Sequence, residues 1–163
     1  MIDIVIFKFD SNGVNETYAK FFLTLWNVYK FHSDYASLDN FNYEKSKTPI
    51  EDRPEIDRWI TSRLATVFEE YNSSFKSWDF HKAVRNLENF LVNDLSNWYV
   101  RRSRRRFWRS ENNTDKLAAY SALYRTLTDL IKVIAPVAPY ITEEIYSNLI
   151  LNSKSGDEPG SIH

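Results

Sequence analysis

The fold is decided by residues 78–108, which read W-D-F-H-K-A-V-R-N-L-E-N-F-L-V-N-D-L-S-N-W-Y-V-R-R-S-R-R-R-F-W. This stretch contains no Gly and no Pro, and its apolar residues recur at the spacing of one helix face. They are Phe80, Val84, Leu87, Leu91, Leu95 and Trp98. We predict a single helix from about Trp78 to about Trp108, roughly 45 Å long at about 1.5 Å per residue.

Further helices are predicted on both sides of this stretch. On the N-terminal side, apolar residues at helical spacing predict helices over about 14–36 and about 55–71. On the C-terminal side, they predict helices over about 115–134 and about 141–149, separated by a break that contains two Pro. The sequence therefore predicts an all-α fold, an antiparallel bundle of four to five helices.

The segments between and before these helices carry local signals. Residues 38–52 are polar and predict a loop, and Asp52 with Glu55 resembles a capping box at the start of the helix that follows. Ser11-Asn12-Gly13 predicts a turn. Residues 2–9 predict either a short strand or a frayed chain end.

These signals divide the chain into three parts. Residues 1–13 stay unassigned, and residues 14–150 form the helical domain. Residues 151–163 contain Gly, Ser and Pro, and we expect them to form a flexible tail that leads to a missing C-terminal part.

Composition excludes several classes of protein. Of the 163 residues, 43% are hydrophobic and 16% aromatic, which is enough to build a core and argues against global disorder. The absence of Cys excludes disulfides and thiolate metal sites. No apolar stretch is long enough to span a membrane, and the N-terminus lacks the pattern of a signal peptide. We therefore expect a cytoplasmic protein without a membrane partner.

Residues that could carry chemistry are sparse. None of the common catalytic, phosphate-binding or metal-binding motifs occurs. Of the three His, His32 lies on an apolar helix face, where a satisfied or solvent-facing ring is the expected state. Glu143-Glu144 opens a helix, where negative charge complements the helix dipole. We expect no catalytic, cofactor or metal site in this chain.

A cluster of arginines is the most unusual feature of the sequence. Six of the 21 basic residues lie between Arg101 and Arg109. At about 100° per residue, Arg102, Arg105 and Arg109 continue the apolar stripe of the long helix. Because a buried unpaired charge is very costly, these arginines must leave the core, pair with acids or meet a partner.

Three interpretations of the cluster stay open. Arginine binds phosphates and carboxylates through two parallel hydrogen bonds and stacks on rings such as those of Phe107 and Trp108, so a polyanion is one partner. An acidic face of a missing domain is the second. The third is a solvated helix end, although complementing the helix dipole takes only one or two cations.

The same cluster carries a family resemblance. Residues 96–108, S-N-W-Y-V-R-R-S-R-R-R-F-W, resemble a segment of the isoleucyl-tRNA synthetases, which are class I enzymes. The resemblance continues, in order and with compatible gaps, at residues 22–29, 57–64, 79–85, 115–120, 135–146 and 158–163. It covers the chain from about residue 14 to the end, and residues 1–13 match nothing in the family.

The resemblance implies a fold and a function. The fold is the class I synthetase anticodon-binding domain, which receives the anticodon stem-loop of tRNA. The complete enzyme is an isoleucine–tRNA ligase that uses ATP and magnesium. The ATP-site signatures of the H-I-G-H and K-M-S-K-S types and the editing domain are absent from this chain, so we expect it to be inactive alone. Its partners are then tRNA, isoleucine-specific by resemblance, and the enzyme's own catalytic domain.

The resemblance also suggests where tRNA binds. The turn between the second and third helices would lie near the anticodon loop, and the arginine cluster nearer the catalytic core. The arginines would contact either the inner limb of the tRNA or the enzyme's own body. The predicted turn residues are Lys76, Trp78, Lys82 and Arg85, with Phe75 beside them. The predicted residues of the cluster are Arg101, Arg102, Arg105, Arg106, Trp108 and Arg109.

Two other functions stay open beside this one. The first is a general RNA-binding helical module, and the second is a protein-interaction bundle whose arginines dock an acidic surface. At the turn, Trp78 and Phe75 are either stacking platforms for unpaired bases or ordinary aromatics of the core or of the hinge.

Overall fold

The computed structural model describes residues 11–109, 113–150 and 159–163, and all regular structure in these ranges is helical. The elements are α1 (Ser11–Thr17), η1 (Tyr18–Phe22), α2 (Leu23–Leu38), α3 (Tyr43–Ser46), η2 (Ile50–Asp52), α4 (Glu55–Lys76), α5 (Phe80–Asn89), η3 (Phe90–Val100), α6 (Arg101–Trp108), α7 (Thr114–Ile134) and α8 (Pro139–Leu149). η1 and η3 are π-helical and η2 is a 3-10 turn. The prediction of an all-α fold is confirmed.

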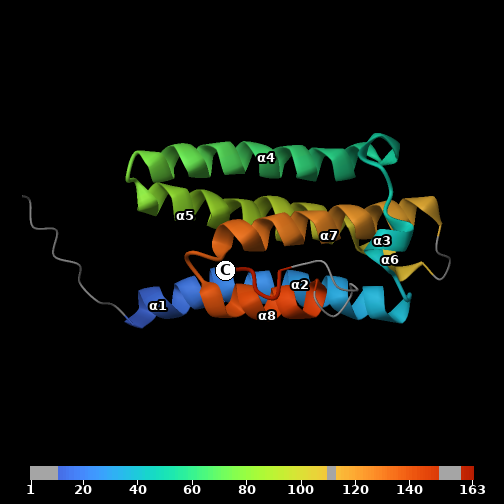
Figure 1. Cartoon of the computed structure of the whole chain (residues 1–163), viewed down its shortest axis with the longest axis horizontal. Coiled ribbons are helices and arrows are strands. Elements are labelled where there is room, and N and C mark those ends of the chain that lie inside the picture. The colour runs from blue at the N-terminus through green and yellow to red at the C-terminus, as the bar shows by residue number, and fades with distance from the viewer. Residues whose placement is uncertain (1–10, 110–112, 151–158) are drawn as a thin grey trace, which may run out of the picture.

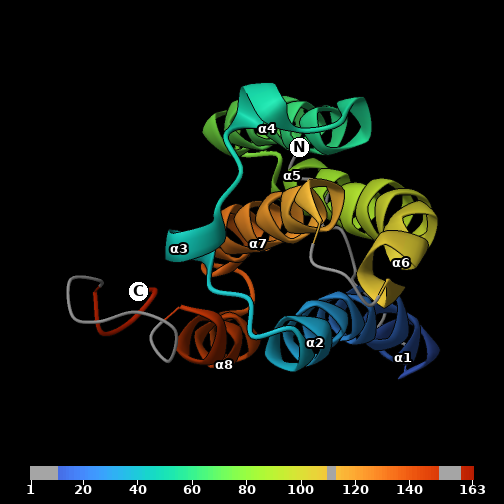
Figure 2. The ribbon, with the colours of Figure 1, turned by 90° about the vertical axis from the view of Figure 1, so that its right-hand side faces the viewer.

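These elements join into five long rods in the described residues. α1, η1 and α2 are continuous, as are α5, η3 and α6, while α4, α7 and α8 each form a rod alone. α4 and α7 run against the other three rods, so the bundle is antiparallel as predicted (Figure 1). Viewed from its end, the bundle has α7 in the middle, between α4 and α5 on one side and α2 and α8 on the other (Figure 2). Because its neighbours surround it, 14 of the 21 residues of α7 are buried.

The long helix is confirmed, but its buried face differs from the predicted one. Phe80 and Trp98 are 43% and 38% exposed, and so do not belong to the core. Seven of its nine buried residues follow one another at four-residue steps, and Phe90 and Val100 lie beside this row; the seven are Ala83, Leu87, Leu91, Leu95, Tyr99, Ser103 and Phe107.

The π-helical segment η3 explains this row. In a straight α-helix each four-residue step turns a side chain by about 40° from the face, because 3.6 residues make one turn. The hydrogen bonds of a π-helix span five residues and give a wider turn, which removes that drift over η3. The row therefore faces the core along its whole length, and the assumption of a uniform 100° per residue fails here.

Several helix boundaries also differ from the prediction. The first helix begins at Ser11, where we predicted a turn, because Ser and Asn are also favoured at helix starts. The strand predicted at residues 2–9 lies outside the described residues. The expected loop at 38–52 contains α3 and η2. α4 continues to Lys76, past the predicted end of this helix at about residue 71.

The predicted capping box is wrong. α4 begins after Pro54, whose backbone is extended, and no side chain caps it. Asp52 lies in the preceding turn η2 and is separated from α4 by two extended residues. Three other helices have side-chain caps, which come from Asn42, Asp79 and Asn113.

One buried ion pair joins three rods near the end of the bundle where α4 and α7 begin. Asp57 of α4 is completely buried. Arg106 donates two hydrogen bonds of 2.7 Å to its carboxylate, and Tyr99 donates a third of 2.7 Å. Arg106 also donates to the backbone carbonyl of Asp115 at 2.8 Å, and its Nε lies 2.9 Å from the Asp115 carboxylate. We call Asp57, Tyr99, Arg106 and Asp115 the buried node.

The buried node corrects our prediction for the arginine cluster. Arg102, Arg105 and Arg109 do not face the core, because all three are exposed. The inward arginine is Arg106, whose side chain is 11% exposed. Burial alone would lower the pKa of Arg106, but the hydrogen bonds and charge of Asp57 raise it. Burial, with the Asp57 charge, raises the pKa of Tyr99 well above its ordinary value, so its hydroxyl stays a donor.

A second buried cation lies close by. Lys116 is 1% exposed, and its ammonium lies 2.5 Å from the Asp39 carboxylate. It also donates to the backbone carbonyl of Arg109 at 2.7 Å. Tyr120 donates to the same Asp39 carboxylate. These contacts tie the end of α2 to the start of α7 and to the residue that follows α6.

The buried node predicts a large effect of one conservative change. Arg106→Gln leaves the Asp57 carboxylate buried without its ion-pair partner, so the free energy of unfolding should fall by about 3–5 kcal/mol. Arg105→Gln removes an exposed neighbour and should change it by no more than about 0.5 kcal/mol. Urea unfolding followed by circular dichroism measures both. Equal stability of the two variants would show that the node does not stabilise the bundle.

Candidate nucleic-acid interface

The turn between α4 and α5 is short and well ordered by backbone hydrogen bonds. The amide of Asp79 donates to the carbonyl of Ser74 at 2.9 Å, and the amide of Trp78 donates to that of Phe75 at 3.1 Å. These two bonds make a Schellman motif, in which Trp78 takes the position that Gly usually occupies. Asp79 then caps α5 through its side chain, 3.1 Å from the amide of Lys82.

Trp78 is held there at a conformational cost. Its φ is +64°, in the left-handed region, which a bulky residue adopts at a cost of roughly 1–2 kcal/mol. Its side chain is nevertheless 80% exposed, so core packing does not repay this cost. The interpretation of Trp78 as a core aromatic is wrong. Trp78 is therefore a strained and exposed indole at the tip of the hairpin between α4 and α5.

Aromatic rings support this indole from below. Trp78 lies 5.7 Å from the ring of Phe80, which in turn lies 4.8 Å from Phe75. Both phenylalanines are about two-fifths exposed. The three rings therefore form an aromatic cluster at the tip of the hairpin, which we call the tip cluster.

Charges around the tip cluster are nearly balanced. Lys76 and Lys82 are exposed, and Lys82 lines a shallow groove together with Glu69 and Glu70. Arg85 is exposed but pairs with Glu88 at 2.9 Å. All four predicted turn residues thus reach solvent, but the acidic residues beside them leave no strongly positive field at this end.

The arginines of α6 form a different kind of surface. Arg101, Arg102, Arg104 and Arg105 are exposed, and none of them forms an ion pair with a described residue. The sequence has no acidic residue from Leu95 to Ser110. We call these four residues the arginine face. Arg106 is enclosed in the buried node, and we leave it out of the proposed contacts.

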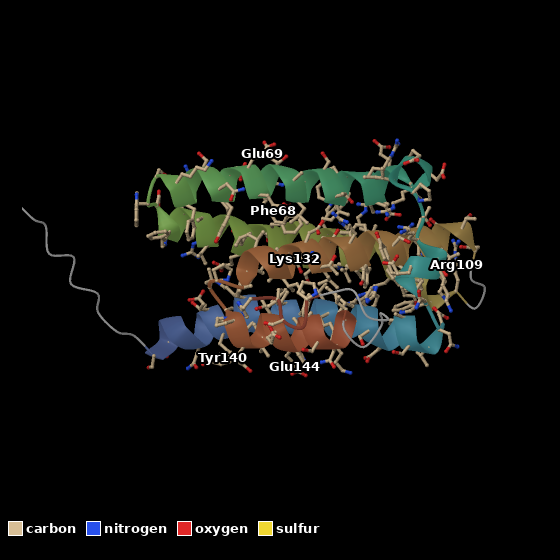
Figure 3. The ribbon with its side chains drawn as sticks, viewed as in Figure 1. Phe68, Glu69, Arg109, Lys132, Tyr140 and Glu144 are labelled. Atoms are coloured by element: carbon tan, nitrogen blue, oxygen red, sulfur yellow. The ribbon has the colours of Figure 1, made fainter. Side chains whose placement is uncertain are left out.

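The last two predicted residues lie where α6 stops. Trp108 is 58% exposed. Arg109 is exposed and lies 3.7 Å from the Asp115 carboxylate, at the end of the bundle opposite the hairpin tip (Figure 3). The hairpin tip and the arginine face therefore lie toward opposite ends of the bundle, about 35 Å apart by the helix rise.

Sequence reasoning missed one residue beside the arginine face. Trp59 of α4 packs on Trp98 of η3 with 4.2 Å between ring centroids, and the guanidinium of Arg102 lies 5.1 Å from the Trp98 ring. Trp59 shares its helix with apolar residues at helical spacing, and nothing in the sequence pairs it with Trp98. Only the packing of α4 against η3 brings the two rings together.

His32 differs from its expected state. It is 2% exposed, and neither ring nitrogen makes a hydrogen bond with a described residue. Its ring lies about 6 Å from the rings of Phe41, Tyr120 and Tyr124. Burial lowers the pKa of His32 from 6.5 to about 4.

This burial predicts acid sensitivity. Between pH 6.5 and about 4 the unfolded chain binds a proton at His32 that the folded chain does not bind. The free energy of unfolding should therefore fall as the pH drops through this window, by about 3 kcal/mol from this residue. His32→Phe should remove that contribution, whereas His81→Phe, at an exposed histidine, should retain it. Urea unfolding at pH 7, 5.5 and 4 tests this, and parallel curves for all three proteins would contradict it.

Other kinds of site receive no support from the described parts of the chain. They contain no group of three or more His, Cys, Asp or Glu residues that could hold a metal ion. Within the same ranges, no helix is both long and apolar enough to cross a membrane.

The exposed aromatic rings at the tip and the arginines on one side are surfaces of the kind that bind RNA. Similarity to known proteins shows the class to which the chain belongs. The family described as the anticodon-binding domain of tRNA ligase matches residues 57–163. The chain belongs to this family, and the predicted class is confirmed.

Particular relatives extend the match toward the N-terminus. The isoleucine–tRNA ligase of Bacteroides thetaiotaomicron is 42% identical over 156 residues, or 96% of the chain. Those of Dehalococcoides mccartyi (strain CBDB1) and Clostridium novyi are 46% and 44% identical, over 88% and 96% of the chain. The chain spans only 13–15% of the length of these relatives.

Proposed function

We propose that this chain is the part of an isoleucine–tRNA ligase that binds the anticodon stem-loop of its tRNA. Membership of the anticodon-binding family supports the RNA ligand, and the names of the relatives support isoleucine. We place the anticodon loop at the hairpin tip because the indole of Trp78 is exposed there in a strained backbone conformation.

The tip cluster suits single-stranded bases. Unpaired loop bases are recognised by stacking on aromatic side chains and by hydrogen bonds to their edges. Most of the Trp78 side chain is open to solvent, and the ring contacts Phe80, which in turn contacts Phe75. Lys76 and Lys82 lie within reach of the neighbouring phosphates, which position the loop without reading its sequence.

Ligation itself belongs to other parts of the complete protein. The proposal includes ATP and magnesium as its cofactors, a catalytic domain that contacts this bundle, and a cytoplasmic location. The described residues offer no cluster that fits a metal ion, so we place no catalytic step here and expect the chain to be inactive alone.

Replacing Trp78 separates binding from folding. Trp78→Gly removes one stacking platform, worth about 1–3 kcal/mol per base, so affinity for an anticodon stem-loop RNA should fall about tenfold. Stability should change by less than about 1 kcal/mol, because relief of the left-handed strain offsets the lost contact with Phe80. Fluorescence anisotropy and urea unfolding give the two quantities.

The matched control is Tyr140→Ala, which removes an aromatic ring that is 91% exposed and projects from α8 away from the hairpin tip (Figure 3). It should leave RNA affinity unchanged. If Trp78→Gly binds the stem-loop as tightly as the parent chain does, the loop does not bind at the tip.

Comparing two tRNAs tests the isoleucine assignment. We expect tighter binding of an isoleucine tRNA than of a valine tRNA, with both affinities falling between about 50 and 200 mM salt as phosphate contacts weaken. Equal binding of the two would mean that this bundle positions tRNA and that identity is read elsewhere. Absence of binding to either would contradict the proposal for the isolated chain.

A further inference from the structure

A cavity of about 340 Å³ lies where the connection between α2 and α4 passes α7. Its wall consists of side chains from this connection, from the first half of α4 and from the middle of α7. None of its lining residues belongs to the hairpin tip or to α6. Volumes of about 300–1,000 Å³ are usual for sites that bind small molecules. We call this space the connection cavity.

The connection is fastened to α7, so the wall of the cavity is already in place. The amide of Thr48 donates to the hydroxyl of Ser121 at 3.0 Å. The ring of Tyr43 stacks on that of Tyr124, with 4.3 Å between their centroids and 21° between their planes. These contacts hold α3 against α7 (Figure 2). A site that is preformed in this way binds a ligand at a lower cost in ordering.

Arg53 supplies a buried cation to the connection cavity. It is only 8% exposed, and its Nε donates to the carbonyl of Thr48 at 2.8 Å, which fixes the orientation of the guanidinium. Neither of its terminal nitrogens makes a hydrogen bond or an ion pair with a described residue, and neither is sealed from solvent. Because burying a charge is costly unless it is paired, this position lacks one negative charge.

The other charged residues of the cavity neutralise each other. Arg125 pairs with Asp129 at 2.7 Å, and both line the cavity together with Arg53. Glu51 and Asp52 precede Arg53 in the chain, but both are exposed and neither lines the cavity. The cavity therefore carries one net positive charge, which a ligand with a single negative charge would neutralise.

The rest of the wall suits an apolar group that also carries oxygen. Leu64 is buried, and Phe68 and Tyr43 are partly buried and pack against the core. Thr126 lines the same cavity, and its buried hydroxyl makes no hydrogen bond with a described residue. A buried hydroxyl without a partner costs stability, and a ligand oxygen would supply the acceptor that this one lacks.

We propose that the connection cavity binds a small organic carboxylate with an aromatic or aliphatic body. The two terminal nitrogens of Arg53 would donate two parallel hydrogen bonds to the carboxylate. The body of the ligand would lie against Leu64, Phe68 and Tyr43. This site lies outside the proposed RNA contacts, and the inference does not depend on them.

The single net charge favours a carboxylate over a phosphate. A phosphate monoester carries about −1.5 to −2 charge at pH 7, so part of its charge would stay unpaired against an apolar wall. A neutral apolar ligand would leave Arg53 without a partner. A carboxylate satisfies both the charge and the apolar wall.

The test uses the 163-residue chain and two probes of the same shape, phenylpropionate and its neutral amide, phenylpropionamide. In two-dimensional NMR of the isotope-labelled chain, phenylpropionate should cause saturable shifts of backbone amide signals in residues 48–53, 61–68 and 125–129. Phenylpropionamide should bind at least about tenfold more weakly, because it cannot pair with the guanidinium. Absence of saturable shifts in these segments, or equal binding of the two probes, would overturn the proposal.

Two variants test the polar contacts. Arg53→Gln should weaken phenylpropionate binding about tenfold or more and remove its advantage over the amide, whereas Arg58→Gln, at an exposed arginine of α4 outside the cavity, should change neither. Thr126→Val keeps the shape of the side chain and should weaken binding about threefold. Its urea midpoint should equal or exceed that of the parent, because an unpaired buried hydroxyl is removed. Full affinity in both Arg53→Gln and Thr126→Val would contradict the proposed contacts.

A third variant tests the location without removing a polar group. Ala65 lines the cavity from an exposed position of α4, so Ala65→Leu should fill part of the space and reduce the affinity for both probes at least tenfold. Thr66→Leu, at the next exposed position and outside the cavity, is the matched control and should bind like the parent. Because both positions are exposed, urea midpoints should stay close to that of the parent. Undiminished binding in Ala65→Leu would place the ligand elsewhere and overturn the site.

Discussion

The rest of the structure depends on the ion pair between Asp57 and Arg106. A fully buried carboxylate is tolerated only if its charge is matched and its oxygens accept hydrogen bonds, and here two bonds come from Arg106 and one from Tyr99. The pair fixes the rotation of α6 about its own axis. Arg106 is turned inward, whereas Arg101, Arg102, Arg104 and Arg105 are exposed. The arginine cluster thus divides into one residue that stabilises the bundle and others that reach solvent.

The π-helical segment makes this geometry possible. Without the wider turns of η3, the buried row would rotate away from α4 and α7 before the helix reached Arg106. Tyr99 belongs both to this row and to the buried node. The helix orientation that buries its ring therefore also brings its hydroxyl to the Asp57 carboxylate. π-helical turns are rare and occur often at functional sites, which agrees with the position of η3 directly before the arginine face.

The hairpin tip and the connection cavity differ in physical character because they lie on different kinds of backbone. The hairpin tip is a turn, where a strained residue can present a whole ring to solvent. The connection cavity lies between α4, α7 and a connection fastened to α7, which hold Arg53 in a fixed orientation. A turn suits the recognition of bases that have left their stack, whereas a preformed cavity with one buried cation suits a small anion.

The sequence by itself determined the helical class, the antiparallel order and the family, because these depend on local spacing and on motifs that a single chain displays. It also placed a turn between the second and third helices, but it left open whether Trp78 is exposed, which the structure shows. Only the tertiary structure decided which arginine is buried, because Asp57 lies 49 positions away and nothing local marks it as the partner. The same holds for the contact between the tilted rings of Trp59 and Trp98, and for the buried ring of His32, whose nitrogens make no hydrogen bond with a described residue. These features arise where helices that are distant in the sequence pack against each other. A sequence-based prediction assumes the same number of residues per turn along every helix. It therefore cannot predict the wider turns of η3, which determine which side chains face the neighbouring helices.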